Sequence, residues 1–197
     1  MLCKETASAK PVPMTRRTWL LALAIVCIAA ATELAMGRHP ICTCGTVDLW
    51  VGQRDSPRTS QMLSDWYSFS HIVHGLLFYA ALWLVARRWP VGWRFVAAVL
   101  VESAWEVTEN TPWIIDRYRA TTAAIGYSGD SIVNSMSDIA MMAIGFLLAR
   151  KLPLCAAVLL VVALELIPLF AIRDNLALNI LSLISPNNAV QTWQRGA

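Results

Sequence analysis

Apolar residues gather in five blocks, each about as long as a helix that crosses a lipid bilayer. A spanning helix needs about 20 mostly apolar residues. The blocks cover residues 19–36, 66–85, 93–109, 131–149 and 154–172. A sixth apolar run, 176–184, is too short to span and is predicted to lie at the membrane interface. The pattern predicts an all-α fold: an integral membrane helical bundle of about five transmembrane helices with a short C-terminal interfacial helix.

The composition agrees with a membrane protein and argues against a soluble enzyme. Hydrophobic residues make up 57% of the 197 residues and charged residues 15%, whereas a soluble domain has about 45–50% and about 25%. The formal net charge is +3, but the positive residues lie between the apolar blocks, where they orient a membrane protein. We therefore expect the lipid bilayer as a partner and no binding to nucleic acid.

Lysine and arginine residues predict the orientation, because they gather at the cytoplasmic ends of spanning helices. One side of the predicted bundle carries them tightly against the block ends. These residues are Lys4, Lys10, Arg16, Arg17, Arg87, Arg88, Arg94, Arg150 and Lys151. We predict that this side is cytoplasmic, with the N-terminus inside and the C-terminus outside.

The predicted organisation has one membrane domain. Residues 1–18 form a cytoplasmic tail, residues 19–172 the membrane domain with an outer loop at 37–64, and residues 173–197 a C-terminal interfacial segment and tail. Arg16-Arg17 before the first block resembles a twin-arginine export signal. The apolar run after it is long for such a signal, so a retained first helix is favoured.

Polar residues occupy the outer halves of the predicted helices, whereas the inner halves are almost purely apolar. Ionisable groups within a membrane are costly and are functional candidates for that reason. The residues that converge at one level are His71, His74, Glu102, Glu106, Glu109, Asp130, Asn134 and Asp138. This convergence predicts a polar cavity that faces outward.

Helical spacing places these residues on shared faces. Residues three and four apart lie on one side of a helix, so Glu102, Glu106 and Glu109 form one stripe. Three carboxylates cannot all stay ionised in a dry bundle. They must face water, pair with cations, bind a metal or be protonated.

A metal centre is the first chemistry that fits this set. The predicted ligands are His71, His74, Glu102 and Glu106, and the predicted ion is Zn²⁺ or Mn²⁺. Helical bundles build such sites from side chains on facing helices. The sequence His-Ile-Val-His is not the zinc signature HExxH, so the spacing permits a metal without specifying one.

Acid/base chemistry on a lipid-borne substrate is the second possibility. The candidate catalytic residues are Glu106, His74 and Asp138. Arginine can grip a phosphate with two hydrogen bonds. The candidate substrate-binding residues are Arg117, Arg119, Asn134, Glu109 and Asp130.

Two functions from different classes therefore stay open. The first is metal-assisted handling of an envelope lipid or lipid-linked substrate in the polar cavity. The second is a non-enzymatic scaffold or accessory subunit, whose polar groups lock helices together by hydrogen bonds or dock a membrane-protein partner.

The predicted outer loop contains Cys42-Thr43-Cys44-Gly45. An oxidising outer compartment permits a disulfide there, and a local structural bridge is the commonest outcome of such a pair. A redox role, or a metal site that also uses His39, is the alternative.

The motifs together resemble an uncharacterised family of small bacterial multi-pass membrane proteins, known by a domain-of-unknown-function label. The motifs are C-T-C-G at 42–45, S-D-W-Y-S-x-S-H-x-x-H-G at 64–75, E-x-x-W-E-x-x-E-N-T-P at 102–112, R-Y-R at 117–119 and G-D-S-x-x-N-S-x-x-D at 129–138. The resemblance covers residues 33–152 and implies a protein of the bacterial inner membrane. It implies no activity, so no catalytic residue is carried over.

The layout of four polar residues also resembles the VanZ-like membrane proteins. These place a histidine in an early helix, an acid in the next, and an aspartate and asparagine at i, i+4 in a later one. The matching positions are His74, Glu106, Asp130 and Asn134. This likeness implies a role in the cell envelope.

Overall fold

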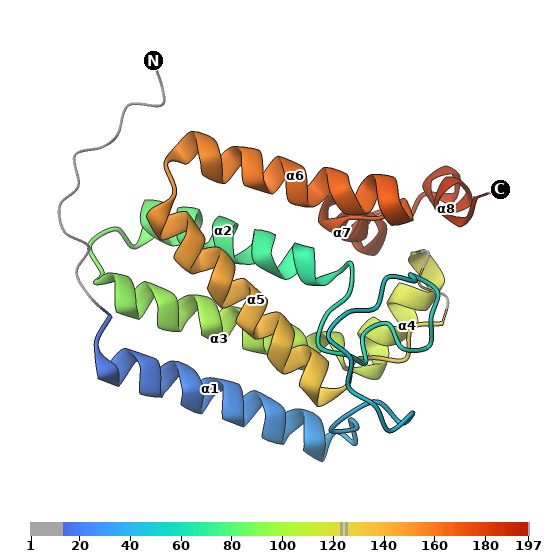
Figure 1. Cartoon of the computed structure of the whole chain (residues 1–197), viewed down its shortest axis with the longest axis horizontal. Helices are drawn as coiled ribbons and strands as arrows, with labels where there is room; N and C mark the ends of the chain where they lie inside the picture. The colour runs from blue at the N-terminus through green and yellow to red at the C-terminus, as the bar shows by residue number, and fades with distance from the viewer. Residues whose placement is uncertain (1–13, 123, 125, 197) are drawn as a thin grey trace.

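The regular structure of the chain is helical, as predicted. The computed structural model describes residues 14–122, 124 and 126–196, and the regular elements in these ranges are eight α-helices (Figure 1). They are α1 (Arg16–Ala35), α2 (Ser68–Val85), α3 (Val91–Glu109), α4 (Pro112–Thr121), α5 (Ile132–Lys151), α6 (Leu154–Ile172), α7 (Leu176–Ile184) and α8 (Asn188–Arg195). Most of the predicted cytoplasmic tail, residues 1–13, lies outside the described residues.

Five long helices run side by side and form the bundle (Figure 1). Of these, α1, α2, α5 and α6 are long and apolar enough to cross a membrane. Helix α3 is equally long but carries three glutamates and an arginine. Glu102 and Glu106 are 0% and 1% exposed, so these two acidic side chains of α3 are turned into the bundle. Helix α3 is therefore a long helix of the bundle, and the prediction that it is a fifth transmembrane helix stays a prediction.

The ends of the helices follow local sequence signals. The hydroxyl of Thr15 accepts a hydrogen bond from the amide of Thr18 and caps α1, so the helix begins three residues before the apolar block. Ser131 caps α5 in the same way. Pro112 occupies the first turn of α4, where its fixed φ angle suits a helix start and its missing amide hydrogen costs nothing.

Two glycines allow α2 and α5 to pack closely. A Cβ atom at Gly75 would overlap the carbonyl oxygen of Met142, and one at Gly145 would overlap the carbonyl oxygen of Ile72. Helix backbones in membranes approach each other most closely where such small residues face each other. This contact fixes the distance between the helix that carries the histidines and the helix that carries Asp138.

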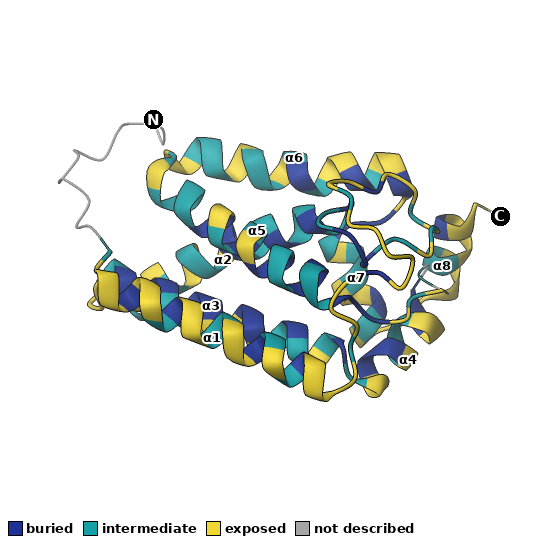
Figure 2. Cartoon of the chain, turned by 60° about the horizontal axis from the view of Figure 1, so that its bottom comes forward, coloured by how far each residue is buried: buried dark blue, intermediate teal, exposed yellow. Residues whose placement is uncertain are grey.

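The outer faces of the bundle are apolar. Exposed residues lie along α1 and α6 (Figure 2), and they include large hydrophobic side chains such as Leu23, Leu159 and Phe170, which is 81% exposed. A soluble protein rarely presents contiguous apolar surface of this kind. The exposed faces therefore suit contact with lipid.

The loops and short helices gather at one end of the bundle, which we call the loop end: residues 36–67, α4, α7 and α8 (Figure 1). Arg38 connects the loop at residues 36–67 with the segment that precedes α5. Its guanidinium donates hydrogen bonds of 2.9 Å to the carbonyl oxygens of Asp130 and Ser128.

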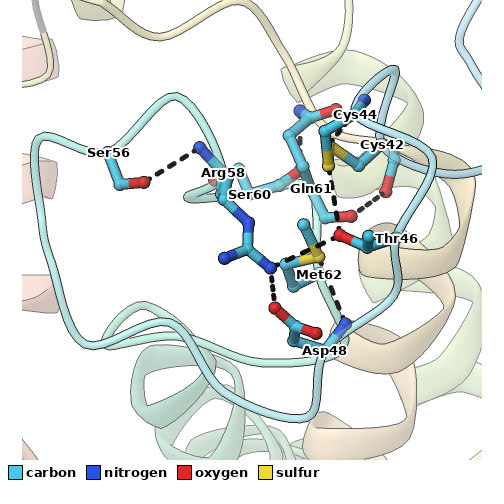
Figure 3. Close-up of a disulfide and its surroundings, with 10 residues drawn as sticks. Cys42, Cys44, Thr46, Asp48, Ser56, Arg58, Ser60, Gln61 and Met62 are labelled. Atoms are coloured by element: carbon cyan, nitrogen blue, oxygen red, sulfur yellow. Dashed lines mark hydrogen bonds and ion pairs between the residues drawn. A yellow bond between two sulfur atoms is a disulfide. The ribbon is translucent and has the colours of Figure 1, made fainter.

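The loop at residues 36–67 folds around a small core of its own. Cys42, Val51 and Met62 are buried together, and Cys42 is bonded to Cys44 (Figure 3). The expected local bridge is therefore present. Arg58 forms an ion pair with Asp48 across the loop (Figure 3).

Candidate functional site

The imidazole of His71 lies among three carboxylates contributed by two other helices. Its Nδ1 atom is 2.7 Å from Oε1 of Glu102 and 3.4 Å from Oε1 of Glu106, both on α3. Its Nε2 atom is 3.8 Å from Oδ2 of Asp138 on α5. Because His71 is 7% exposed, these interactions are formed away from bulk water and are screened little.

A second histidine contacts the same carboxylate. Nδ1 of His74 is 3.0 Å and 3.1 Å from the two oxygens of Glu102. His71 and His74 are one helical turn apart on α2, which places both rings on the side that faces α3. His71, His74 and Glu102 each offer one ligand atom, and these atoms lie within 4.8 Å of one another. We call these three residues the His–Glu cluster.

Asp138 is held by hydrogen bonds from the start of α2. The hydroxyl of Ser68 donates to Oδ1 of Asp138 at 3.1 Å and accepts from the amide of Asp65 at 3.2 Å. The carboxylate of Asp65 in turn accepts hydrogen bonds from the amides of Ser60 and Tyr67. These bonds orient Asp138 toward His71.

A second polar group lies nearer the loops. The side-chain amide of Asn110 donates to Oδ2 of Asp130 at 3.0 Å. The hydroxyl of Tyr127 donates to both carboxylate oxygens of Asp130, at 3.0 and 3.1 Å. The same hydroxyl is 3.4 Å from Oε1 of Glu109. Burial raises the pKa of Asp130 to about 6, although the hydrogen bonds from Tyr127 and Asn110 act to lower it. Burial also raises the pKa of Tyr127 well above its usual value, so the phenol keeps its proton.

The two polar groups border one cavity of about 390 Å³. The polar part of its lining includes His71, His74, Glu102, Glu109, Asp130 and Asp138. The apolar part includes Leu77, Phe78, Val101, Trp105, Ile180 and Leu183. Among the described residues, no lysine or arginine lines it. The site is therefore both amphiphilic and acidic.

Helix α7 supplies part of the apolar wall and is held in place through its backbone. The guanidinium of Arg117 donates two hydrogen bonds, of 3.0 and 2.7 Å, to the carbonyl oxygen of Leu183 near the end of α7. Oε2 of Glu165 accepts from the amide of Ala177 at 3.1 Å. The side chain of Asn175 caps the helix start by accepting from Leu178. Helix α7, which forms this part of the cavity wall, is therefore held at both of its ends.

Three of the predicted substrate-binding residues point elsewhere. The guanidinium of Arg117 is used by α7, and Nε of Arg119 donates to the carbonyl oxygen of Tyr127 at 2.6 Å. Asn134 is buried and its side-chain amide donates to the carbonyl oxygen of Met62 at 2.9 Å. None of the three lines the cavity, so any role for them in binding stays a prediction.

Glu106, predicted as a metal ligand and a base, is buried beside the cluster. It does not belong to the group whose ligand atoms lie within 4.8 Å of one another. Its Oε1 atom has no hydrogen-bond partner among the described residues and lies 3.4 Å from Nδ1 of His71. This position suits a proton acceptor next to the histidine, and ligation by Glu106 stays a prediction.

The contributions of Tyr127 and α7 to the cavity do not follow from the sequence pattern. Tyr127 lies in an irregular segment where no periodicity indicates which way a side chain points. The apolar run of α7 was recognised, but its place against the cavity depends on the turn at Arg173, which adopts a left-handed conformation with a φ of 58°.

Comparison with known proteins shows which family the chain belongs to. A model of the family described as "Protein of unknown function (DUF2585)" matches residues 33–196. A UPF0314 protein of Paracoccus denitrificans is 53% identical over 183 residues, covering 91% of this chain and 94% of the relative. A UPF0314 protein of Sphingopyxis alaskensis is 50% identical over 184 residues, covering 93% and 97%. No solved structure matches the chain.

The expected resemblance to an uncharacterised bacterial family is confirmed, whereas the likeness to VanZ-like proteins stays a prediction. The family match covers four of the five long helices, α2, α3, α5 and α6, and every residue that lines the cavity. The chain is a member of the DUF2585 family of bacterial proteins.

Proposed function

We propose that this protein binds an amphiphile in the cavity and acts on the polar end of that molecule by metal-assisted acid/base chemistry at the His–Glu cluster. One observation carries the proposal: the cluster forms part of the polar lining of a cavity whose other walls are apolar. A ligand with an apolar chain and a reactive head would fill both parts. In the bacterial envelope this description fits a lipid or a lipid-linked substrate.

The cluster has the chemistry of a divalent metal site. Two imidazole nitrogens and one carboxylate suit Zn²⁺ or Mn²⁺, and catalytic zinc sites commonly use three protein ligands and leave one position for water or substrate. His71, His74 and Glu102 would hold the ion. A bound ion would supply a Lewis acid and a water molecule of lowered pKa.

Glu106 and Asp138 would move protons at this centre. Each has a carboxylate oxygen within 4.0 Å of a ring nitrogen of His71, at 3.4 Å and 3.8 Å. A general base must lie within reach of the proton that it accepts, either directly or through one water molecule. Ser68 keeps Asp138 oriented by its hydrogen bond.

We also propose that the loop end faces the outside of the bacterial inner membrane. Lysine and arginine residues flank the opposite end of the bundle: Arg16 and Arg17 begin α1, Arg87 and Arg88 lie between α2 and α3, and Lys151 ends α5. This distribution is typical of a cytoplasmic side. The cavity would then be reached from the outer leaflet.

The scaffold function remains the alternative, because the same contacts cross-link helices. His71 connects α2 with both α3 and α5. In that case the cluster would contribute stability alone, and substitution would weaken the bundle without changing metal content.

Metal analysis distinguishes the two. The protein is reconstituted in lipid nanodiscs, stripped with a chelator, reloaded with Zn²⁺ or Mn²⁺ and measured by elemental analysis. We expect about one ion per chain for the wild type, and none retained after the double substitution His71→Ala/His74→Ala. His39→Ala is the matched control, since His39 is an exposed histidine outside the cluster.

A second readout does not depend on a variant. Cobalt(II) loaded into the wild-type protein is expected to give visible absorption bands of a low-coordinate site, and zinc should abolish them by displacement. A wild-type protein that retains no ion would remove the metal from the proposal. Helical circular dichroism of each variant shows whether a loss of metal is merely a loss of fold.

A further inference from the structure

We propose that the amphiphile held in the cavity carries a positively charged amine as its head, and that the cavity rejects anionic phosphate heads. This inference rests on the proposed function only in assuming that an amphiphile binds. It follows from the charge and the aromatic residues of the lining.

Among the described residues that line the cavity, acidic side chains outnumber basic ones. Glu102, Glu109, Asp130 and Asp138 line it, and Glu106 lies directly behind. His71 and His74 are the positive partners within it, and each already contacts Glu102. A surplus of carboxylates in a poorly solvated site is stabilised by a cation and destabilised by a further anion.

The arginines that would hold a phosphate are committed elsewhere. Arg117 and Arg119 donate to the carbonyl oxygens of Leu183 and Tyr127, and neither lines the cavity. A phosphate head would therefore meet carboxylates without any guanidinium to bind it.

Aromatic side chains share the lining of the cavity with the acidic groups. Tyr67, Tyr118, Tyr127 and Trp105 all line the cavity, and the rings of Tyr118 and Tyr127 pack edge to face with centroids 5.3 Å apart. The faces of such rings attract cations, and cages of aromatic residues are a recurrent way to recognise ammonium groups. The combination of aromatic rings with carboxylates favours an ammonium head over a neutral one.

A metal ion in the His–Glu cluster does not alter this conclusion. The ion would bind mainly through Glu102 and the two neutral histidines, and its charge would offset only part of that of the carboxylates. Glu109 and Asp130 lie toward the loops, and neither belongs to the group of residues that would hold the ion.

The size of the cavity limits the ligand to a slender molecule. Its volume of about 390 Å³ lies near the lower end of the range of about 300–1,000 Å³ for ligand pockets. The apolar part, between Leu77, Phe78 and α7, takes one alkyl chain. The polar part leaves room for a small head.

The test compares two ligands that differ in the charge of the head. Dodecylamine and dodecyl phosphate, each with bromine atoms at the end of the chain, are titrated into the protein in phosphatidylcholine nanodiscs. Bromine quenches tryptophan fluorescence on contact, and Trp105 lines the cavity. The same titration is repeated with the variant Trp105→Phe. Quenching that occurs in the wild type and not in the variant comes from Trp105, so it reports binding in the cavity and excludes the other tryptophans.

We expect saturable, Trp105-dependent quenching by the amine at a concentration at least about tenfold lower than by the phosphate. Glu109→Gln should bring the two binding concentrations closer together, because it removes a carboxyl group that can pair with the amine. Asp116→Asn is the matched control, since Asp116 is an exposed acid on α4 outside the cavity, and should leave the ratio unchanged.

Each outcome decides between the two proposals. Equal binding of both ligands, or tighter binding of the phosphate, overturns the inference and leaves the proposed function standing. Absence of Trp105-dependent quenching by either ligand overturns both. Amine-selective binding that persists in His71→Ala/His74→Ala supports the inference even where the metal proposal fails.

Discussion

His71 and Glu102 form the shortest polar contact between α2 and α3, with Nδ1 and Oε1 2.7 Å apart and both side chains buried. This contact joins two long helices, and it fixes the ring whose other nitrogen faces Asp138.

Removal of the Glu102 carboxylate should be strongly destabilising. Loss of one partner from a buried ion pair typically costs about 3–5 kcal/mol, because the other partner is left buried without its counter-charge. We expect Glu102→Ala to lower the free energy of unfolding by about 3 kcal/mol and Glu102→Gln by less, since the amide can still accept a hydrogen bond. Denaturant titration in mixed micelles, followed by circular dichroism, measures both, with Asp116→Asn as the exposed control.

The contact between α2 and α5 should tolerate no side chain at either glycine. Gly75→Ala places a methyl group against the carbonyl oxygen of Met142, and the helices must separate to admit it. Overpacking of this kind costs about 1–3 kcal/mol. We expect a lower midpoint of thermal unfolding, because α2 and α5 must move apart at this contact.

Gly126→Ala is the control for that substitution. A Cβ atom at Gly126 has nothing within 4 Å, so we expect no change in the unfolding midpoint. If Gly75→Ala were as stable as Gly126→Ala, the close packing of the two helices would be contradicted.

Asp174 should make stability depend on pH. Burial raises its pKa from the usual 3.8 to about 6, so the folded protein binds this proton more tightly than the unfolded chain does. The resulting stabilisation is complete below pH 3.8 and is lost as the pH rises through 6. We expect Asp174→Asn to flatten the stability profile of the protein between pH 4 and pH 7.

Denaturant titration at a series of pH values measures how the free energy of unfolding depends on pH in the wild type and in Asp174→Asn. Asp116→Asn removes an exposed carboxylate and should leave the profile as it is in the wild type. A profile that is equally steep with and without Asp174 would show that this carboxyl group is not responsible.

The two bridged cysteines should differ in their importance. Cys42 is buried with Val51 and Met62, whereas Cys44 is exposed. A disulfide stabilises the folded state mainly by restricting the unfolded chain, and the effect grows with the length of the loop that it closes. The loop between Cys42 and Cys44 is very short, so the gain is small. We expect Cys44→Ser to have little effect and Cys42→Ser to lower the unfolding midpoint, because it also places a hydroxyl group in the small core. Equal effects of the two substitutions would indicate that the bond itself, and not the packing, stabilises the loop.

The sequence predicted the long elements well because each depends on local information. The blocks at 154–172 and 176–184 coincide with α6 and α7, since proline and asparagine residues mark their starts. The short helices α4 and α8 were not predicted as helices. They have only ten and eight residues, which is fewer than the window of about 11–18 residues over which a helical periodicity is recognised.

The site was predictable to the extent that helical spacing determines it. His71, His74 and Glu102 were identified because residues one turn apart share a face. The directions of Arg117 and Arg119 were not, because a long flexible side chain can reach a backbone carbonyl in a neighbouring segment as readily as a ligand. Only the folded arrangement shows that no arginine among the described residues lines the cavity.

The anchoring of α7 has a consequence for how the family can diversify. Arg117 and Glu165 hold this helix by a main-chain carbonyl and a main-chain amide, and main-chain groups are present whatever side chains the helix carries. Ile180 and Leu183, which face the cavity, can therefore change in size without loosening the wall. Relatives could acquire different chain-length preferences through single substitutions in α7, with the reactive end of the cavity left intact.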